Sequence, residues 1–199
     1  MAEIPAISDV PFGSPDIIRE LKLAVDTLAG RIGGNVDYGT IDGVRTKVLD
    51  IVHLCNMGRI KARAYRNAAQ SIDAAALTKV AIDTISRDTE GVVDIANNRI
   101  IPNLPGDYIV IGNVRARNVP DGQRITAWIY KNGAAASAGT YGEQGAIGAP
   151  TSAASDLIYM NGTTDYLELY AFNSHSSALA LYIGGQAPAH NYLSILGPF

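Results

Sequence analysis

The sequence predicts a mainly β protein: about ten short antiparallel strands packed as a sandwich or jelly roll, after a short N-terminal arm and a helix. Three observations support this fold class. From about Arg59 onward, short alternating runs of apolar and polar residues are broken by turn residues. No convincing helical periodicity separates these runs. The final residues, 192–199, are rich in aromatic and aliphatic side chains, as expected of a core strand.

The strand candidates alternate with turn-forming residues. Asn132–Gly133 and Asn161–Gly162 flank strands in the way that hairpin turns do. Within 107–115 both sets of alternate residues begin with apolar side chains, so we expect this strand to be buried on both faces at its start. The predicted strands are 61–65, 78–82, 92–95, 98–101, 107–115, 124–131, 157–160, 166–172, 178–183 and 192–196.

The N-terminal part predicts an arm and one helix. Pro5 and Pro11 oppose helix formation within residues 1–13. Ser14, Pro15 and Asp16 then provide a cap, a first-turn proline and an acid at the positive end of the helix dipole. The apolar residues of this helix recur at steps of three and four, as in a short coiled-coil seam: Ile18, Leu21, Val25 and Leu28. Either the helix packs on its own domain, or it bundles about the axis of an oligomer.

Two segments have no clear regular structure. Residues 31–59 form a connector, in which 31–39 is a Gly-containing loop and 40–58 favours either a helix or a strand. Residues 133–155 are rich in Gly and Ala and predict a long loop. Tyr141, Glu143 and Gln144 are its only sizeable polar side chains, so they are the candidates for a ligand contact.

Composition excludes several classes of function. A formal net charge of -3 offers no electrostatic attraction for nucleic acid or an anionic membrane. No apolar run approaches the roughly 20 residues that span a bilayer, and the N-terminus lacks the features of a secretory signal. The single cysteine, Cys55, excludes an intrachain disulfide. We therefore expect a soluble protein made in the cytoplasm, with no membrane insertion.

Four segments occur in the order of a known pattern: LPGDYIVIGNV (104–114), ITAWIYKNG (125–133), NGTTDYLELYAF (161–172) and NYLSILGPF (191–199). With these segments the chain resembles the complement-globular-head and tumour-necrosis-factor-like (TNF-like) jelly roll, in the version found in many bacteriophage virion proteins. The resemblance covers about residues 60–199 and rests on order and spacing. It implies three parts: an N-terminal anchor (1–30), a connector or neck (31–59) and a jelly-roll head (60–199).

The resemblance also implies a homotrimer with an apolar axis near the last strand. The candidate core or interface residues are Tyr166, Leu169, Tyr182, Tyr192, Leu193, Ile195, Leu196 and Phe199. The N-terminal part is similar to phage fibre and decoration proteins, in which the arm docks on the virion. The residues implied as this anchor are Ile4, Ile7, Val10, Phe12, Ile18, Leu21, Val25 and Leu28. No obligatory metal or other cofactor is implied.

Catalytic and metal-binding patterns are not evident. His53, His175 and His190 lie in separate segments without the paired spacing of metal ligands. There is no nucleophile elbow, phosphate loop or dinucleotide fingerprint. Carboxylates converge only in space, and the nearest candidates for a glycosidase pair are Asp156, Asp165 and Glu168, for which structural roles are favoured.

A basic cluster lies at the start of the β region. Arg59, Lys61, Arg63 and Arg66 recur over eight residues. They could contact an acidic partner, but we favour a solvated strand edge or neck, since lysine and arginine also prevent unwanted pairing of edge strands.

The leading hypothesis is a non-enzymatic bacteriophage virion protein, a trimer that decorates the capsid or forms a short head fibre. Its expected partners are itself and the major capsid protein or tail proteins. An alternative is a tail-fibre or receptor-binding tip that contacts a host-surface glycan or protein. A third hypothesis, a carbohydrate-active enzyme, has the least support.

Overall fold

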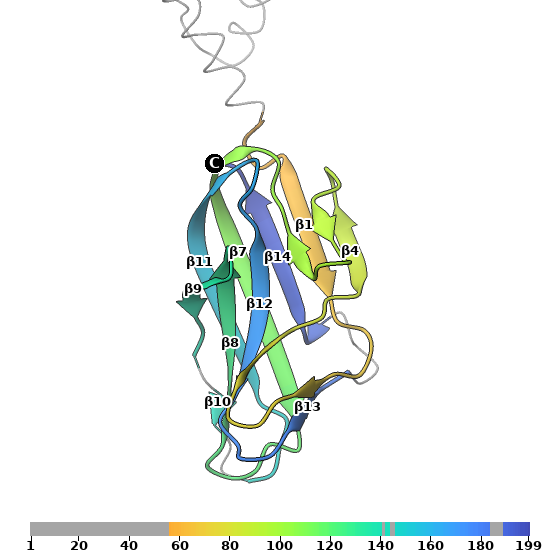
Figure 1. The fold of residues 1–199 in the computed structure, drawn as a ribbon, viewed down its shortest axis with the longest axis vertical. Coiled ribbons are helices and arrows are strands. Elements are labelled where there is room, and N and C mark those ends of the chain that lie inside the picture. The colour runs from red at the N-terminus through yellow and green to blue at the C-terminus, as the bar shows by residue number, and fades with distance from the viewer. Residues whose placement is uncertain (1–55, 141, 144–145, 184–188) are drawn as a thin grey trace, which may run out of the picture. The chain divides into compact units, whose positions relative to one another are not determined.

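The computed structural model describes residues 56–140, 142–143, 146–183 and 189–199. Two β-sheets pack face to face in this part of the chain (Figure 1). Residues 56–199 belong to one compact unit. Its strands pair antiparallel throughout, as expected for a jelly roll built from hairpins and longer crossovers.

The first sheet has the strand order β2–β13–β7–β14–β1–β4, with β11 on the other side of β7. The last strand of the chain therefore lies between two long partners, β7 and β1. Its strands are β1 (Ile60–Tyr65), β2 (Ser71–Ile72), β4 (Thr84–Asp88), β7 (Pro105–Arg117), β11 (Thr151–Asn161), β13 (Leu179–Leu181) and β14 (Tyr192–Gly197).

The second sheet has the order β10–β8–β12–β6–β5, and β9 and β3 also pair with β8 and β12. Its two long central strands are paired along their whole length. Its strands are β3 (Leu77–Lys79), β5 (Val93–Asp94), β6 (Arg99–Ile100), β8 (Arg124–Lys131), β9 (Ala134–Ala138), β10 (Gly142–Glu143) and β12 (Leu167–Asn173).

The core lies between the two sheets and follows the two-residue period of the strands. Tyr108 and Val110 of β7 are fully buried, as are Ile129 of β8 and Leu193 of β14. The Tyr108 hydroxyl donates to the Leu104 carbonyl at 2.8 Å, so the one polar atom of this side chain is satisfied. Burial raises the pKa of Tyr108 to about 12. The mainly β jelly-roll prediction is thus confirmed.

The segment 133–155 is not the long loop that its composition predicts. Asn132 and Gly133 both have positive φ, 54° and 77°, and form a two-residue hairpin turn that pairs β9 with β8. β10 and the start of β11 also lie within this segment. Ala and Gly have low strand propensity, but pairing with an established neighbour decides the conformation here.

Other strand predictions differ in their limits. The prediction for 157–160 found only the end of β11, and that for 78–82 ran past β3, which ends at Lys79. Val80 and Ile82 are nevertheless buried, and the Val80 amide donates to the Leu169 carbonyl at 2.8 Å. The short β2 and the edge strand β4 were not predicted, since neither has a clear alternating pattern.

The strand around 107–115 is buried on one face only at its start, from Asp107 to Ile111. Tyr108, Val110 and Val114 face the core, whereas Ile109 and Ile111 on the opposite face are exposed. The prediction of burial on both sides at the start of this strand is therefore wrong for the described part of the chain, in which no residue covers Ile109 and Ile111.

Candidate self-association surface

The face of the first sheet that points away from the core carries a row of apolar side chains. In the strand register, Leu157 of β11 lies opposite Ile109 of β7, and Ile109 lies opposite Leu196 of β14. These side chains are 61%, 43% and 37% exposed, respectively. Directly opposite residues have Cβ atoms roughly 4.5–5.5 Å apart, so the three form a continuous strip across three strands.

Two further residues widen this strip on either side. Ile111, 38% exposed, follows Ile109 on the same face of β7, and Tyr159, 56% exposed, follows Leu157 on β11. We call these five residues, Ile109, Ile111, Leu157, Tyr159 and Leu196, the apolar patch. It lies entirely on long, well-paired strands, so its shape is set by the sheet rather than by loops.

A contiguous group of apolar side chains is unusual on a solvent-exposed surface. Single exposed apolar residues are common, but contiguous ones usually mark a contact surface. The inward neighbours of the same strands, such as Val110 and Leu193, already complete the core. The five outward side chains therefore contribute little to the packing between the two sheets, and none of the described residues buries them.

Six of the eight residues predicted for the core or the trimer interface separate into two groups in the described structure. Leu169, Leu193 and Ile195 are buried between the sheets. Tyr192 and Leu196 lie on the outer face of β14, and Phe199 is 38% exposed near Asp107, whose carbonyl accepts the Phe199 amide at 3.0 Å. Of the apolar patch, only Leu196 was among the predicted residues. The signal for the others was the doubly apolar pattern of 107–115 and its partner strand.

Tyr166 and Tyr182 lie apart from the patch. Tyr166 precedes β12 in the second sheet, and the Arg99 guanidinium lies 4.9 Å from its ring centre. Tyr182 follows β13 and holds the Arg115 guanidinium 4.3 Å from its ring centre, with the His190 ring at 5.0 Å on its edge. Burial, and then the nearby Arg115 charge, lower the pKa of His190.

Several predicted residues fall outside the described part of the chain. These include all eight anchor residues between Ile4 and Leu28, and His53. Tyr141 and Gln144 of the predicted ligand loop are also outside it, and Glu143 belongs to β10. Their roles stay predictions.

Two of the three carboxylates considered for catalysis, Asp165 and Glu168, have structural partners, whereas Asp156 is exposed. Asp165 accepts hydrogen bonds from Asn132 Nδ2 at 2.8 Å and from the Asn161 amide at 3.0 Å, and it pairs with Lys131 Nζ at 2.9 Å. The hydrogen bonds from Lys131 and Asn132 lower the pKa of Asp165. Asp165 therefore holds the β8 end and the turn after β11 together through three protein donors.

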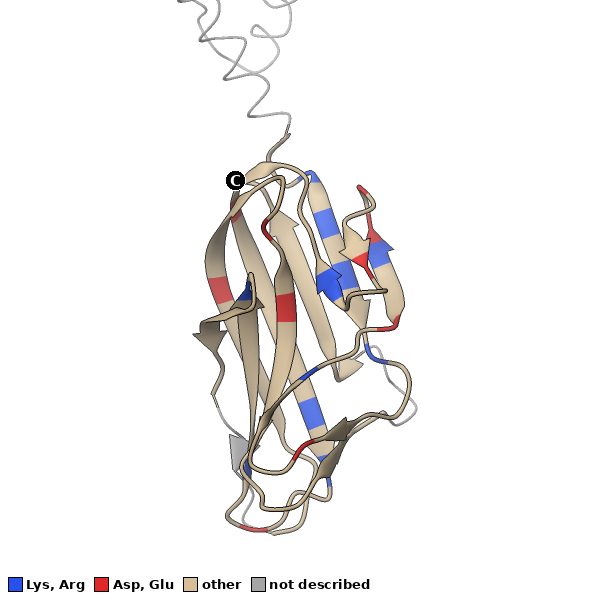
Figure 2. Ribbon diagram, viewed as in Figure 1, with Lys and Arg blue, Asp and Glu red and all other residues tan. Residues whose placement is uncertain are grey.

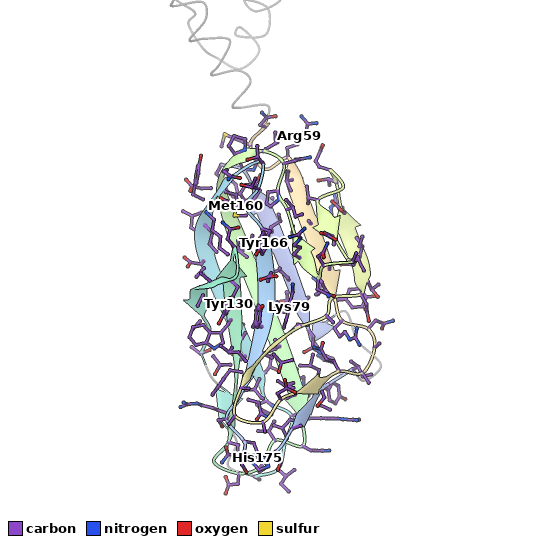
Figure 3. All side chains as sticks on the ribbon, in the orientation of Figure 1. Arg59, Lys79, Tyr130, Met160, Tyr166 and His175 are labelled. Carbon is purple, nitrogen blue, oxygen red and sulfur yellow. The ribbon has the colours of Figure 1, made fainter. Side chains whose placement is uncertain are left out.

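Glu168 is almost buried on the outer side of the second sheet. Lys79 Nζ lies 2.5 Å from its carboxylate and also donates to the Asn97 carbonyl at 2.7 Å. Beside them the rings of Tyr130 and Tyr170 stack with centres 4.2 Å apart. Burial, and then the charge of Glu168, raise the pKa of Tyr170. Figure 3 shows Lys79 and Tyr130 in the middle of the molecule and His175 near the end away from the C-terminus.

Among the residues that the structure describes, no three His, Cys, Asp or Glu side chains are grouped as metal ligands. In the same residues, no helix has the length and hydropathy to cross a membrane.

No protein-family model and no curated protein matches the sequence. Solved structures do match. Murine APRIL at pH 5.0 aligns with a TM-score of 0.51 and 8% identity, over 69% of this chain and 97% of that one. Eiger TNF from S. frugiperda aligns with a TM-score of 0.50 and 11% identity, over 70% and 92% of the two chains. The chain has a TNF-like jelly-roll fold.

The globular domain of zebrafish complement 1qA aligns with 8% identity and a TM-score of 0.48, over 71% of this chain and 98% of that domain. At these identities the likeness concerns the jelly roll alone. The apolar patch is therefore argued from the residues of this chain alone.

Proposed function

We propose that this chain is a non-enzymatic bacteriophage virion protein: a homotrimer whose jelly-roll head projects from the particle and whose N-terminal part anchors it. The observation that carries the proposal is the apolar patch on the outer face of the first sheet. The remaining elements, the number of copies and the virion, rest on the resemblance of the sequence to phage jelly-roll heads and to the arm and helix that precede them.

Self-association explains the patch better than a small ligand does. The five side chains lie on a sheet face rather than around a pocket, and binding sites for small molecules are usually concave. An apolar surface on a sheet face, with a core on its other side, suits another protein surface of similar shape. A second copy of the same chain carries such a surface and is always present at the same concentration. Burying the patch would also remove Ile109 and Leu157 from water.

We propose no enzymatic role because the acidic residues considered for catalysis that are buried already have structural partners. Asp165 and Glu168 are held by Lys131 and Lys79. A general acid or base needs access to a substrate, and these carboxylates are almost buried with their hydrogen bonds made within the protein. This favours structural roles for both.

The test of self-association uses the full chain. Light scattering should give about three times the chain mass of 21.0 kDa. Ile109→Lys places a charge in the centre of the patch and should shift the protein to single chains while circular dichroism stays that of a β protein. The matched control is Leu77→Lys, at a residue of similar exposure in the second sheet, which should stay trimeric. A monomeric parent chain would contradict the proposal.

The virion role needs a separate test. We expect the protein in purified particles at a copy number comparable with that of the major capsid protein, as for a capsid decoration or head fibre. Only a few copies per particle would favour the alternative, a tail-fibre tip that contacts the host surface. Deleting residues 1–30 should leave a folded head that no longer joins particles, and continued incorporation would contradict the anchor.

A further inference from the structure

The outer face of the second sheet carries a group of aromatic side chains. Residues of β8 and β12 that alternate with the core-facing ones point to this face. Trp128 of β8 lies directly opposite Tyr170 of β12, and the ring centre of Tyr130 lies 4.2 Å from that of Tyr170. Phe172 follows Tyr170 on the same face of β12. We call Trp128, Tyr130, Tyr170 and Phe172 the aromatic platform.

The aromatic platform is partly open to solvent, since all four side chains are half-buried. The Trp128 Nε1 is enclosed and has no hydrogen-bond partner within the described residues, so the exposed part of this side chain is carbon. The hydroxyls of Tyr130 and Tyr170 also make no hydrogen bond in that part of the chain, but neither is enclosed. The platform therefore offers apolar ring surface together with accessible hydroxyl groups.

Small side chains border the aromatic platform on the β9 side. Ala138 lies opposite Trp128 in the register, and Ala135 lies opposite Tyr130. Both alanines are exposed. A methyl group cannot cover an aromatic ring, so β9 leaves the two rings accessible.

A lysine borders the platform on the other side. Lys79 of β3 lies opposite Tyr170, and Figure 3 shows Lys79 and Tyr130 on either side of β12. The Lys79 Nζ pairs with Glu168 at 2.5 Å and donates to the Asn97 carbonyl at 2.7 Å. An ammonium has three N–H donors, and within the described residues only these two are used. The third is available at a side chain that is 30% exposed.

Ion pairs neutralise the charges on this side of the platform. β3 and β6 flank β12 and contribute Lys79 and Arg99, which pair with Glu168 and with Asp94, the latter at 2.9 Å. Figure 2 shows the acidic position on β12 and no other charged position in the middle of β8 or β12, whereas basic positions gather on β1 and β4. The platform thus suits a neutral ligand better than an acidic or basic one.

This combination of groups matches the chemistry of a sugar ring. A pyranose has a face of C–H groups, polarised by the ring and hydroxyl oxygens, and a rim of hydroxyls. The negative face of an aromatic ring attracts such C–H groups, and the Lys79 ammonium and the tyrosine hydroxyls can hydrogen-bond to the rim. A glycan chain is extended, so it can lie along a sheet face without an enclosing pocket.

A protein partner fits the platform less well. A standard interface buries roughly 800 Å² on each partner. Four half-buried side chains expose far less than this, whereas stacking of one or two sugar rings needs only a small area.

We propose that the aromatic platform binds a neutral glycan, with sugar rings stacked on Tyr170 and Trp128 and a hydroxyl accepting from Lys79. This inference goes beyond the proposed virion role and does not rest on it. The platform and the apolar patch lie on the outer faces of different sheets, so burial of the patch does not itself cover the platform.

The first experiment uses the fluorescence of the full chain. Trp128 is the only tryptophan of the sequence, so its emission reports on the platform. The probes are neutral tetraoses of glucose, galactose, mannose, rhamnose and N-acetylglucosamine, each added to about 10 mM. At least one should change the emission along a saturable curve, with a dissociation constant below about 5 mM. A heparin tetrasaccharide, the acidic comparison, should leave the emission unchanged.

The second experiment places the binding on the platform. Tyr170→Ala removes the central ring and should weaken binding of that tetraose at least about tenfold. Tyr170→Phe keeps the ring and should stay within about threefold of the parent chain. The matched control is Tyr159→Ala, at an exposed tyrosine on the first sheet, which should leave the affinity unchanged. Circular dichroism and thermal unfolding show whether each variant folds.

A third measurement needs no variant and decides the matter if Tyr170→Ala does not fold. Selective irradiation of the aromatic protons of the parent chain should transfer saturation to the C–H protons of the bound sugar ring. Absence of this transfer would overturn the stacking.

The remaining outcomes are equally decisive. No saturable change with any neutral tetraose, or a change with heparin alone, would overturn the inference. A folded Tyr170→Ala variant with the parent's affinity would overturn the assigned site. A single-chain parent that binds the glycan would overturn self-association and leave this inference standing, and a trimeric parent that does not bind would do the reverse.

Discussion

Gly112 of β7 and Leu169 of β12 meet across the sandwich so closely that a Cβ on Gly112 would lie 2.7 Å from Leu169 Cδ1. The same Cβ would lie 3.3 Å from Ile129 Cγ1. The two sheets are therefore in contact at a point where only a hydrogen fits on β7. This contact gives the first of four predictions about the head.

Gly112→Ala should destabilise the head by overpacking, by about 1–3 kcal/mol in urea unfolding. Leu169→Ala should cost about 2–5 kcal/mol through the cavity that it leaves. Because the added methyl group would occupy part of that cavity, the double variant should cost clearly less than the two single costs combined. If the cost of the double variant equals the sum of the two single costs to within about 0.5 kcal/mol, the close contact is contradicted.

Leu193 and Leu196 on β14 should respond differently to the same change. Leu193 is fully buried, so Leu193→Ala should lower the unfolding free energy by about 2–5 kcal/mol and lower the thermal midpoint at every protein concentration. Leu196 lies in the apolar patch, so the effect of Leu196→Ala should depend on concentration, because it acts through association. Thermal midpoints over about a hundredfold range of concentration test this. Equal behaviour of the two variants would contradict the assignment of opposite faces.

The Asp165 carboxylate should contribute to stability in a pH-dependent way. Its hydrogen bonds from Lys131 and Asn132 lower its pKa in the folded state. Its contribution is therefore complete above the ordinary aspartate pKa of about 3.9 and is lost as the pH falls through the lower, folded-state value. Asp165→Asn should reduce stability near neutral pH and flatten the acid side of the stability profile. The exposed Asp121→Asn is the control, and an unchanged acid side for Asp165→Asn would contradict the prediction.

Removing one partner of the Lys79–Glu168 pair should lower the unfolding free energy of the head more than removing both. Glu168 is almost buried, so Lys79→Met would leave a carboxylate without its cation. The expected cost is about 1–3 kcal/mol, below that of a fully buried pair because Lys79 is partly in solvent. Lys79→Met/Glu168→Leu should recover much of this loss in urea unfolding. A double variant less stable than Lys79→Met would contradict it.

The parts of the fold that were predictable from sequence are those with a local signal. β8 was predicted with its observed limits, Arg124–Lys131, because alternating residues end at the Asn132–Gly133 turn. β9 lacks such a signal, since its residues are mostly alanine and it exists as a strand through pairing with β8. β4 is an exposed edge strand whose pairing with β1 is its main support.

The candidate surface was likewise predictable only where a local sequence signal exists. The alternation of 107–115 determined which residues of β7 share a face, and the order of motifs indicated the jelly roll. Sequence could not distinguish Ile109 from Val110, because both are apolar residues of one strand and burial depends on what packs against each face. It also could not show that Leu157, Ile109 and Leu196, far apart in the chain, lie in one row.

The sequence by itself therefore determined the strand-rich fold class and the two-residue period of each long strand, since both follow from local geometry and turn chemistry. Only the tertiary structure decided which apolar face of the first sheet is left uncovered by the other described residues. Strand order and register are set by pairings between distant segments, and these pairings place side chains on a common surface that no local pattern encodes.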